Sequence, residues 1–459
     1  MVWGGRLALT RPNTLLNLAR SLLKPAFIVK SACPTQTASF RPRGVLPLAL
    51  AILIRLLEPA RVHAEDRVEY RYEEYKEDDN RMDIRTHAVG YEMALSAKVN
   101  TKGLLVYDSI SGATPTGEAP PTGSNQVPLA HMHDIRRAAS LNLGVAYGKS
   151  TTTPEFSYSE ESDYISRGVA VTQTLDLNQK NTTLVFGVAH NFDSVGGGTL
   201  LGEWKSKDTT DFMLGVNQLL SPKTVFTANL TLGYADGYMN DPYRLTTFLL
   251  PESPDPIFSD PANVNATAEQ RPGHKFKQVA YTSINQFVTP LDGAVEASYR
   301  FYHDDWGIFS HTASVAWLQK IGRFATLSPF FRYYWQSAAD FYAPYFHGVS
   351  YAQYADGTQV AFQDGVFLAF QGDPEFPTGG GEGYQIIDVP ARPAYYSSDY
   401  RLSELESLTY GITLQVKIAD RVSFDFGYRR YEMNGLDGVT PKSAYPSAHV
   451  FTVGCGIWF

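Results

Sequence analysis

The chain has 459 residues, of which 44% are hydrophobic, 19% charged and 13% aromatic, and its formal net charge is −8. The first 64 residues hold nine of the 39 basic and one of the 47 acidic residues, which leaves 30 basic and 46 acidic groups in the remainder. This acidic balance argues against a nucleic-acid partner, because binding nucleic acid needs a basic surface. The 28 Tyr and 26 Phe residues modestly favour a membrane barrel, which carries aromatic girdles at both interfaces.

The N-terminal part of the chain has the pattern of an export signal. An apolar run of ten residues, 45–54, follows a basic stretch, and Val62-His63-Ala64 has the small residues of a cleavage site. We therefore expect residues 1–64 to be a leader that is cleaved after Ala64. The apolar run is too short to cross a membrane as a helix, and no later segment reaches eighteen apolar residues.

The remaining sequence alternates apolar with small or polar residues, over runs of nine to thirteen residues. In an extended strand this alternation makes one face apolar and the other polar. A soluble β-sandwich shows the same alternation, but its strands usually have about five or six residues, whereas a tilted membrane strand needs about 9–11. We therefore predict an all-β fold, a transmembrane antiparallel up-and-down β-barrel, over residues 65–459. Its sixteen predicted strands are 67–76, 84–96, 102–110, 135–148, 153–160, 165–177, 182–192, 209–219, 223–236, 273–288, 293–303, 308–319, 323–338, 403–417, 421–433 and 447–459.

The connections between these strands alternate in length. Short ones, such as 178–181 and 289–292, are followed by longer or more polar ones, such as 237–272 and 339–402. Short turns on one side of the membrane and long loops on the other are typical of outer-membrane barrels. An even strand number also returns the C-terminus to the side on which the first strand begins. Fourteen strands are the alternative, in case 153–160 and its neighbour are loop.

The last predicted strand carries an assembly signal. Apolar side chains alternate along it, and the chain ends in an aromatic residue, a pattern that the outer-membrane assembly machinery generally requires. An ordinary buried last strand is the alternative. We expect that machinery and outer-membrane lipid as partners. The residues of the predicted signal are Phe451, Val453, Ile457 and Phe459.

Three longer blocks carry a resemblance to a known family. They are SISGATPTG at 109–117, YRFYHDDWGI at 299–308 and RYYWQSAADFY at 332–342. Over most of residues 66–459 the chain is similar to the bacterial domain-of-unknown-function family 3570. The resemblance implies an outer-membrane-type barrel of Gram-negative bacteria, encoded near thioredoxin-like, small lipoprotein and flavin-transferase genes. Because the family has no established activity, the resemblance assigns no functional residue.

Charged and amide side chains lie opposite the apolar face in several predicted strands. Both signs occur, so we expect neighbouring strands to pair them. A ring of such groups selects solutes in a channel; alternatively, the groups satisfy one another and block the lumen. The candidates for lining the lumen are Glu296, Arg300, Arg332, Gln336, Gln415, Lys417, Asp425 and Arg429.

Two other groups have the residue types of a reactive site without its geometry. His131-x-His133-Asp134 offers two imidazoles, which are too few for a metal site. Ser310 and His311 are neighbours in a predicted strand, so their side chains face opposite ways and cannot form a hydrolase pair directly. The stretch Asp304–Gly307 is interpreted as a tight turn with Gly307 in an unusual backbone conformation. We expect no catalytic residue, metal or cofactor.

Three functions remain open for a protein exported to the outer membrane of a Gram-negative bacterium. The first is a channel or porin-like barrel, because sixteen strands can enclose an aqueous pore. The second is a plugged barrel that scaffolds periplasmic redox or flavin-linked lipoproteins, and the third is a hydrolase. The aromatic-rich insertion 339–402 extends a hairpin beyond the membrane, constricts the lumen or presents a stacking surface to a ligand.

Overall fold

The computed structural model describes ten ranges of the chain. The predicted leader and its cleavage site fall before them, so the leader stays a prediction. The described residues are 66–121, 124–196, 202–249, 266–347, 351–354, 359–363, 366–367, 384–387, 393–418 and 421–459.

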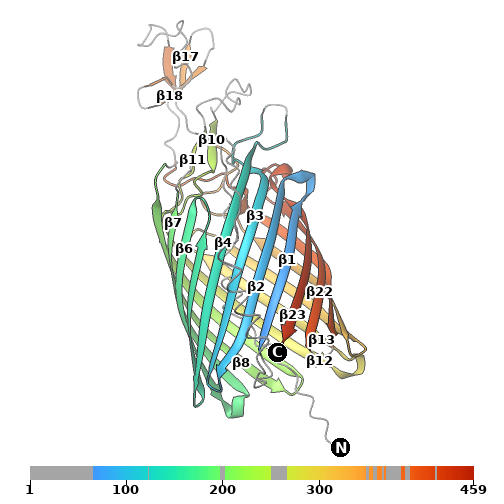
Figure 1. Ribbon diagram of the computed structural model, residues 1–459. Helices are drawn as coiled ribbons and strands as arrows, with labels where there is room; N and C mark the ends of the chain where they lie inside the picture. Colours follow the sequence, from blue (N-terminus) through green and yellow to red (C-terminus); the bar gives the residue numbers. More distant parts are fainter. Residues whose placement is uncertain are drawn as a thin grey trace, which may run out of the picture.

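Sixteen antiparallel strands form one closed barrel, in which β1 pairs with β2 on one side and with β23 on the other (Figure 1). The prediction of sixteen strands is therefore confirmed. The fourteen-strand alternative fails because the segment on which it depended lies in the wall as β5. The barrel strands are β1 (Arg67–Glu77), β2 (Met82–Ser96), β3 (Val99–Pro115), β4 (Leu129–Tyr147), β5 (Ser150–Glu160), β6 (Tyr164–Leu177), β7 (Thr182–Val195), β8 (Lys205–Ser221), β9 (Thr224–Gly237), β12 (His274–Val288), β13 (Gly293–Asp304), β14 (Phe309–Ile321), β15 (Ala325–Gln336), β21 (Leu405–Ile418), β22 (Val422–Gly435) and β23 (Ser447–Trp458).

The strand register gathers the apolar residues on the outside of the barrel. On β14, Val315 lies opposite Phe331 of β15, and Phe331 in turn lies opposite Tyr410 of β21. These side chains are 43%, 45% and 41% exposed, so a continuous apolar surface faces outward. The next register row, Ser314 opposite Arg332, faces the lumen. A soluble protein of this size would bury such a surface; in hydrocarbon it is favourable.

Two rings of polar side chains border this apolar belt, an upper ring near the long-loop end and a lower ring near the turn end. Near the long-loop end, tyrosine hydroxyls bond to histidines on the outer face, with the Tyr299 hydroxyl 2.6 Å from Nδ1 of His311. Near the turn end, Gln218 donates to the backbone carbonyl of Leu219 and accepts a hydrogen bond from the Thr182 hydroxyl. The same pattern recurs at the other members of each ring. The further members are Tyr70–His87, Tyr428–His449, Gln173–Thr152 and Gln286–Thr224.

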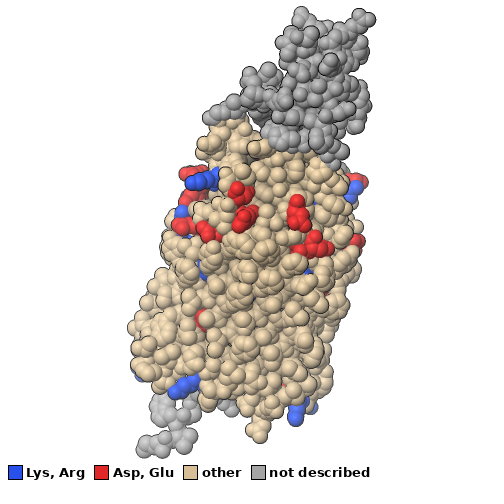
Figure 2. Space-filling model, turned by 180° about the vertical axis from the view of Figure 1, so that it is seen from behind, with Lys and Arg blue, Asp and Glu red and all other residues tan. Residues whose placement is uncertain are grey.

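The distance between the two rings matches a membrane. On β14, His311 belongs to the upper ring, and Gln319, which accepts from the Trp317 indole, lies eight residues further along the strand at the level of the lower ring. At about 3.3 Å per residue and a tilt of about 40°, that stretch rises roughly 20 Å. Outer-membrane barrels carry an apolar band about 25 Å tall. Figure 2 shows the charged side chains gathered towards the two ends of the barrel, with a nearly uncharged surface between them.

The predicted alternation of turns and loops is present. A turn of two residues, 222–223, joins β8 to β9, whereas residues 337–404 join β15 to β21. Figure 1 places the smaller strands beyond the long-loop end. One small sheet has the order β11-β10-β16 and another the order β19-β18-β17-β20. Their strands are β10 (Leu245–Leu249), β11 (Ala266–Ala268), β16 (Phe346–His347), β17 (Tyr351–Tyr354), β18 (Gln359–Gln363), β19 (Val366–Phe367) and β20 (Tyr384–Ile387).

Helical structure in the described ranges is confined to single 3-10 turns. None of these turns is long or apolar enough to cross a membrane. The 3-10 helices are η1 (Asp78–Asn80), η2 (Asn178–Lys180), η3 (Thr289–Leu291), η4 (Tyr400–Leu402) and η5 (Lys442–Ala444).

The inside–outside assignment predicts opposite effects for two adjacent substitutions on β14. Val315→Arg places a charge in the middle of the apolar belt and should destabilise the folded barrel by about 2–4 kcal/mol. Ser314→Gln, on the lumen face, should cost less than about 1 kcal/mol. Urea titration of refolding into lipid vesicles measures both values, and equal losses would contradict the assignment.

Candidate functional site: a lumen closed by a loop cap

The register places all eight lumen candidates on the inner face of the wall. Glu296, Arg332 and Arg429 are solvent-exposed there, as are Gln415 and Lys417, so water reaches the inner surface beneath the long-loop end. Arg300 and Asp425 are partly buried. Gln336 differs, because it is 7% exposed and its amide donates to the backbone carbonyls of Arg401 and Ser403. That these residues select a solute stays a prediction.

Ion pairs between neighbouring strands line the inner face. Asp425 lies 3.8 Å from Arg71 on β1. Closer pairs come from strands that were not singled out, such as Lys277 with Asp211 at 2.9 Å and Arg136 with Asp108 at 3.1 Å. These pairs could have been predicted from the sequence, because every second residue of a strand faces inward.

Two inner-face glycines allow the charged side chains to lie flat on the wall. A Cβ atom at Gly233 would collide with the side chains of Asp211 and Lys277. A Cβ at Gly454 would likewise collide with the carboxylate of Asp425. Glycine is therefore needed beneath these charged groups, because it lets them lie along the wall. A larger residue at either position would push them into the lumen.

The long-loop end is covered by an assembly of loops that we call the loop cap. Its segments belong to the loops after β3, β9, β15 and β22, and they bury many side chains, several of them polar. Tyr243 and Arg244, for example, are 4% and 1% exposed. The loop cap consists of residues 116–121, 124–128, 238–249, 266–273, 337–347, 393–404 and 436–446.

One segment of the loop cap crosses the mouth. Tyr243 follows β9, the ninth strand of the ring, but packs against Met82, Ile110 and Met132 on the inner faces of β2, β3 and β4. In the same segment, the backbone N–H of Leu245 donates to the carbonyl of Thr116 at 2.9 Å. The loop after β9 is thus attached to the opposite wall.

A buried ionic network joins this loop to the one that precedes β21. Asp399 is 1% exposed and lies 2.8 Å from a guanidinium nitrogen of Arg271 and 3.9 Å from Arg244. Glu269, 2% exposed, lies 2.7 Å from Arg271. Burial alone would raise the pKa of Asp399, but Arg401 and Arg244 hold it below its ordinary value. The Asp399 carboxyl is therefore ionised and binds three guanidinium groups.

Arg401 completes the network from the exposed side. It donates to both oxygens of Asp399 and lies 2.6 Å from Asp241. Three arginines and three carboxylates, Asp241, Glu269 and Asp399, then face one another, so the formal charges balance. Truncating one partner of a buried pair is strongly destabilising, even where the intact pair contributes little net stability. The network therefore fixes the relative position of the two loops.

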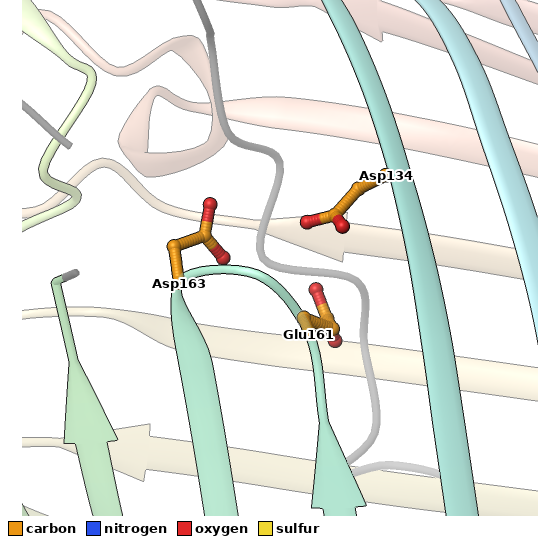
Figure 3. Close-up of side chains that lie close together, drawn as sticks. All are labelled: Asp134, Glu161 and Asp163. Carbon is orange, nitrogen blue, oxygen red and sulfur yellow. The ribbon is translucent and has the colours of Figure 1, made fainter. Parts of the chain in front are cut away.

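A cluster of three carboxylates lies where the loop cap meets the wall (Figure 3). Asp134 points inward from β4, and Glu161 and Asp163 come from the β5–β6 turn; one oxygen of each lies within 4.8 Å of the others. The Ser162 hydroxyl donates to Asp134 at 2.9 Å, and the Tyr243 hydroxyl donates to Asp163 at 2.7 Å. Burial raises the pKa of Glu161 to about 8. Such a group can hold a proton at neutral pH, or a hard cation such as Ca²⁺.

The structure separates the residues of the two weaker sequence motifs. His131 and His133 are exposed on the outer face of β4, whereas Asp134 faces inward, so the three do not share a metal. Ser310 is 4% exposed on the inner face, while His311 bonds to Tyr299 outside. Sequence reasoning missed Glu161 and Asp163; the acidic Glu161-Ser162-Asp163 turn next to an inward Asp134 was the available signal.

The predicted turn after β13 is confirmed. Gly307 has φ +82°, in the left-handed region. The Asp304 carboxylate accepts hydrogen bonds from the backbone N–H groups of Trp306 and Ile308, both at 3.1 Å. Asp304 therefore caps a turn and is not placed as a catalytic acid.

Comparison of the sequence with protein families gives one match. The family described as "Protein of unknown function (DUF3570)" matches residues 49–203 and 201–442. The chain belongs to this family. This match confirms the resemblance to family 3570 that the three sequence blocks indicate. No curated protein matches the sequence.

Several solved outer-membrane structures resemble the DUF3570 barrel at low sequence identity. The siderophore receptor PirA from Pseudomonas aeruginosa shares 10% identity at a TM-score of 0.37, over 86% of this chain and 63% of the receptor. A bacterial polysaccharide outer membrane secretin shares 7% at 0.40, over 87% and 99%. A loop-deletion mutant of OmpT of Vibrio cholerae shares 8% at 0.39, over 86% and 98%. The chain thus spans less than two thirds of PirA, and these likenesses assign it no solute.

The carboxylate cluster makes the loop cap sensitive to pH. Because the pKa of Glu161 is higher in the folded protein than in the unfolded chain, folding favours its protonated form. Stability is therefore lost as pH rises from about 4.5 towards about 8 and stays low above that. Glu161→Gln should slow amide hydrogen exchange of residues 241–247 relative to wild type at pH 9 but not at pH 5. The outer-face variant Glu160→Gln is the control, and equal exchange in wild type and Glu161→Gln at pH 9 would contradict this assignment.

Removing one buried arginine should open the loop cap without unfolding the wall. Arg244→Met leaves Asp241 and Asp399 short of a partner, at a local cost of about 3–5 kcal/mol. We expect cleavage of segments 238–249 and 393–404 by added protease at a rate at least tenfold above wild type, while the wall strands stay intact. The matched control is Arg85→Met, which removes an exposed surface pair. A cleavage rate equal to that of the control would show that the network does not hold the cap.

Proposed function

We propose that this protein is an outer-membrane channel for small polar or charged solutes, exported with a cleaved leader and gated on the outside by the loop cap. The observation that carries the proposal is a water-exposed, charge-lined inner wall beneath a cap whose own ions are buried. The barrel type is that of outer-membrane proteins, and its apolar belt suits a membrane.

The lower lumen supports conduction. Arg332 and Arg429 are exposed on the inner face, together with Glu296, Gln415 and Lys417. Sixteen-stranded barrels are wide enough for an aqueous channel. Basic and acidic groups that line one pathway lower the barrier for ions of both signs, and their balance sets the preference.

The loop cap supports gating, because it is sealed by ions as well as by apolar side chains. Buried ion pairs contribute little net stability, since separated ions regain their hydration. Moving the loop of Arg244 and Glu269 away from that of Asp399 would therefore expose groups that water solvates well. A seal of this kind can open at modest cost, for instance when a solute or a partner binds outside.

The density of the same cap favours a second function, a closed barrel that acts as a scaffold. Residues such as Arg244, Phe248 and Glu269 are among its most completely buried side chains. In that case the partners would be periplasmic redox or flavin-linked lipoproteins at the turn end. The barrel-assembly machinery, acting through the terminal strand, is a proposed partner in both cases.

Conductance in planar bilayers separates the two functions. We expect wild type to be mostly closed and to show rare steps. Arg244→Met, and a variant with residues 238–273 replaced by a short Gly-Ser turn, should show frequent ohmic steps, with Arg85→Met behaving like wild type. In the open variants, Arg332→Glu combined with Arg429→Glu should shift the reversal potential in a salt gradient towards cation selectivity. Silence of both cap variants, despite folded barrels, would reject the channel in favour of the scaffold.

A further inference from the structure

Four arginines point outward in the upper ring of the described strands, and they differ in how they are paired. Arg85 lies 3.0 Å from Asp83 and 3.4 Å from Glu74. Arg430 lies 2.6 Å from Asp78 and 3.3 Å from Glu432. Arg137 on β4 and Arg167 on β6 are exposed and form no hydrogen bond or ion pair with any described residue.

These two arginines lie next to each other across a single strand. Arg137 pairs in register with Glu160 of β5, and Arg167 pairs with Tyr158, two residues before Glu160. Neighbouring strands are about 4.8 Å apart, so the two Cα atoms are roughly 12 Å apart, and both guanidinium groups can reach the space over β5. Figure 1 shows β4 and β6 on the same side of the barrel.

Their height on the barrel is that of the membrane interface. Arg137 lies opposite Tyr107, whose ring centroid is 6.3 Å from that of His87 in the upper ring, and Arg167 lies opposite the outward-facing Tyr158. Below Arg167 on the same strand, Val169 and Val171 are 44% and 43% exposed and belong to the apolar belt. An arginine at this height has its stem against hydrocarbon and its head among lipid headgroups.

The patch formed by Arg137, Arg167 and Glu160 has an excess of positive charge that can bind an anion from outside the protein. Glu160 is the acidic side chain between the arginines, and it already accepts a hydrogen bond from the Tyr158 hydroxyl at 3.3 Å. Two arginines and one glutamate leave one net positive charge. In the headgroup layer the anions available are lipid phosphates, for which the guanidinium fork is the best-suited side chain.

We propose that Arg137 and Arg167 form a binding site for a phosphorylated glycolipid of the outer leaflet. The phosphate groups bind over β5 between the two guanidinium groups, and the acyl chains lie against Leu141, Phe156 and Val169 below them. The inference uses the proposed outer-membrane location with the long loops outside, but not conduction. A protein that does not conduct would leave this inference intact. Recovery of the protein in the soluble fraction would contradict the outer-membrane location on which it rests.

The test titrates the full-length barrel in detergent with bisphosphorylated lipid A and counts bound lipid by native mass spectrometry. Replacing both arginines, R137Q with R167Q, should weaken binding at least about tenfold, because the phosphates lose both of their guanidinium partners. E160Q should tighten binding, because it removes the acid beside the phosphates. R85Q is the matched control, a paired arginine at the same height, and should bind like wild type.

Two further probes identify what is bound. Lipid A without phosphates should bind wild type as weakly as the double variant binds the phosphorylated form, and inorganic phosphate at the same concentration should not compete. Equal binding of both lipids, unchanged affinity of the double variant, or competition by inorganic phosphate would each overturn the proposal. The single variants R137Q and R167Q, each expected to lose part of the affinity, provide the same test if the double variant fails to fold.

Discussion

Hydrocarbon offers no hydrogen-bond partner to a peptide group, so every N–H and C=O that enters a bilayer must be paired within the protein. An open sheet leaves two edges unpaired, and only the contact between the first and last strands removes both. Here that contact is the pairing of β1 with β23, from Arg67 opposite Trp458 to Glu77 opposite Ala448. The outward belt, the inward charges and the position of the cap all follow from this closure.

Closure also explains why the two faces of the wall differ so strongly. The outer face meets lipid and is apolar between the two polar rings, as at Val315 and Phe331. The inner face is polar and carries ion pairs such as Lys277 with Asp211, which lie flat because Gly233 has no side chain. Arg332 and Arg429 are solvent-exposed on the inner face, whereas the loop cap at the mouth buries charged side chains such as Arg244.

Much of the wall was predictable from the sequence, because lipid enforces the alternation over each membrane-spanning stretch. The ends of the strands were less predictable. The runs 102–110 and 135–148 correspond to β3 (Val99–Pro115) and β4 (Leu129–Tyr147), which pair further at the long-loop end. There the outer face meets water, so residues such as His131 can be polar and the alternation disappears. Pairing continues because the inner face is still covered, as Met132 is by Tyr243.

The loop cap was beyond the reach of sequence reasoning for a different reason. Arg244 and Asp399 are far apart in the chain and lie in loops without periodicity, so no local pattern links them. The eight lumen candidates were predicted from the alternation of side chains along each strand, which gives the face of the wall but not the distance from the mouth. Gln336 faces inward as expected, and yet it bonds to the loop cap. The lipid-facing arginines are another such case, since only the positions of the side chains show that Arg137 and Arg167 form no ion pair with a described residue, whereas Arg85 and Arg430 do.

The most direct measurement is a scan of nitroxide spin labels along β14 in lipid bilayers, at positions 313 to 317. Collision rates with oxygen, which partitions into hydrocarbon, and with a water-soluble nickel complex report what surrounds each label. We expect oxygen exposure at Ala313, Val315 and Trp317 and nickel exposure at Ser314 and Ala316. A profile without this period of two, or with nickel exposure at Val315, would show that the apolar belt does not face lipid.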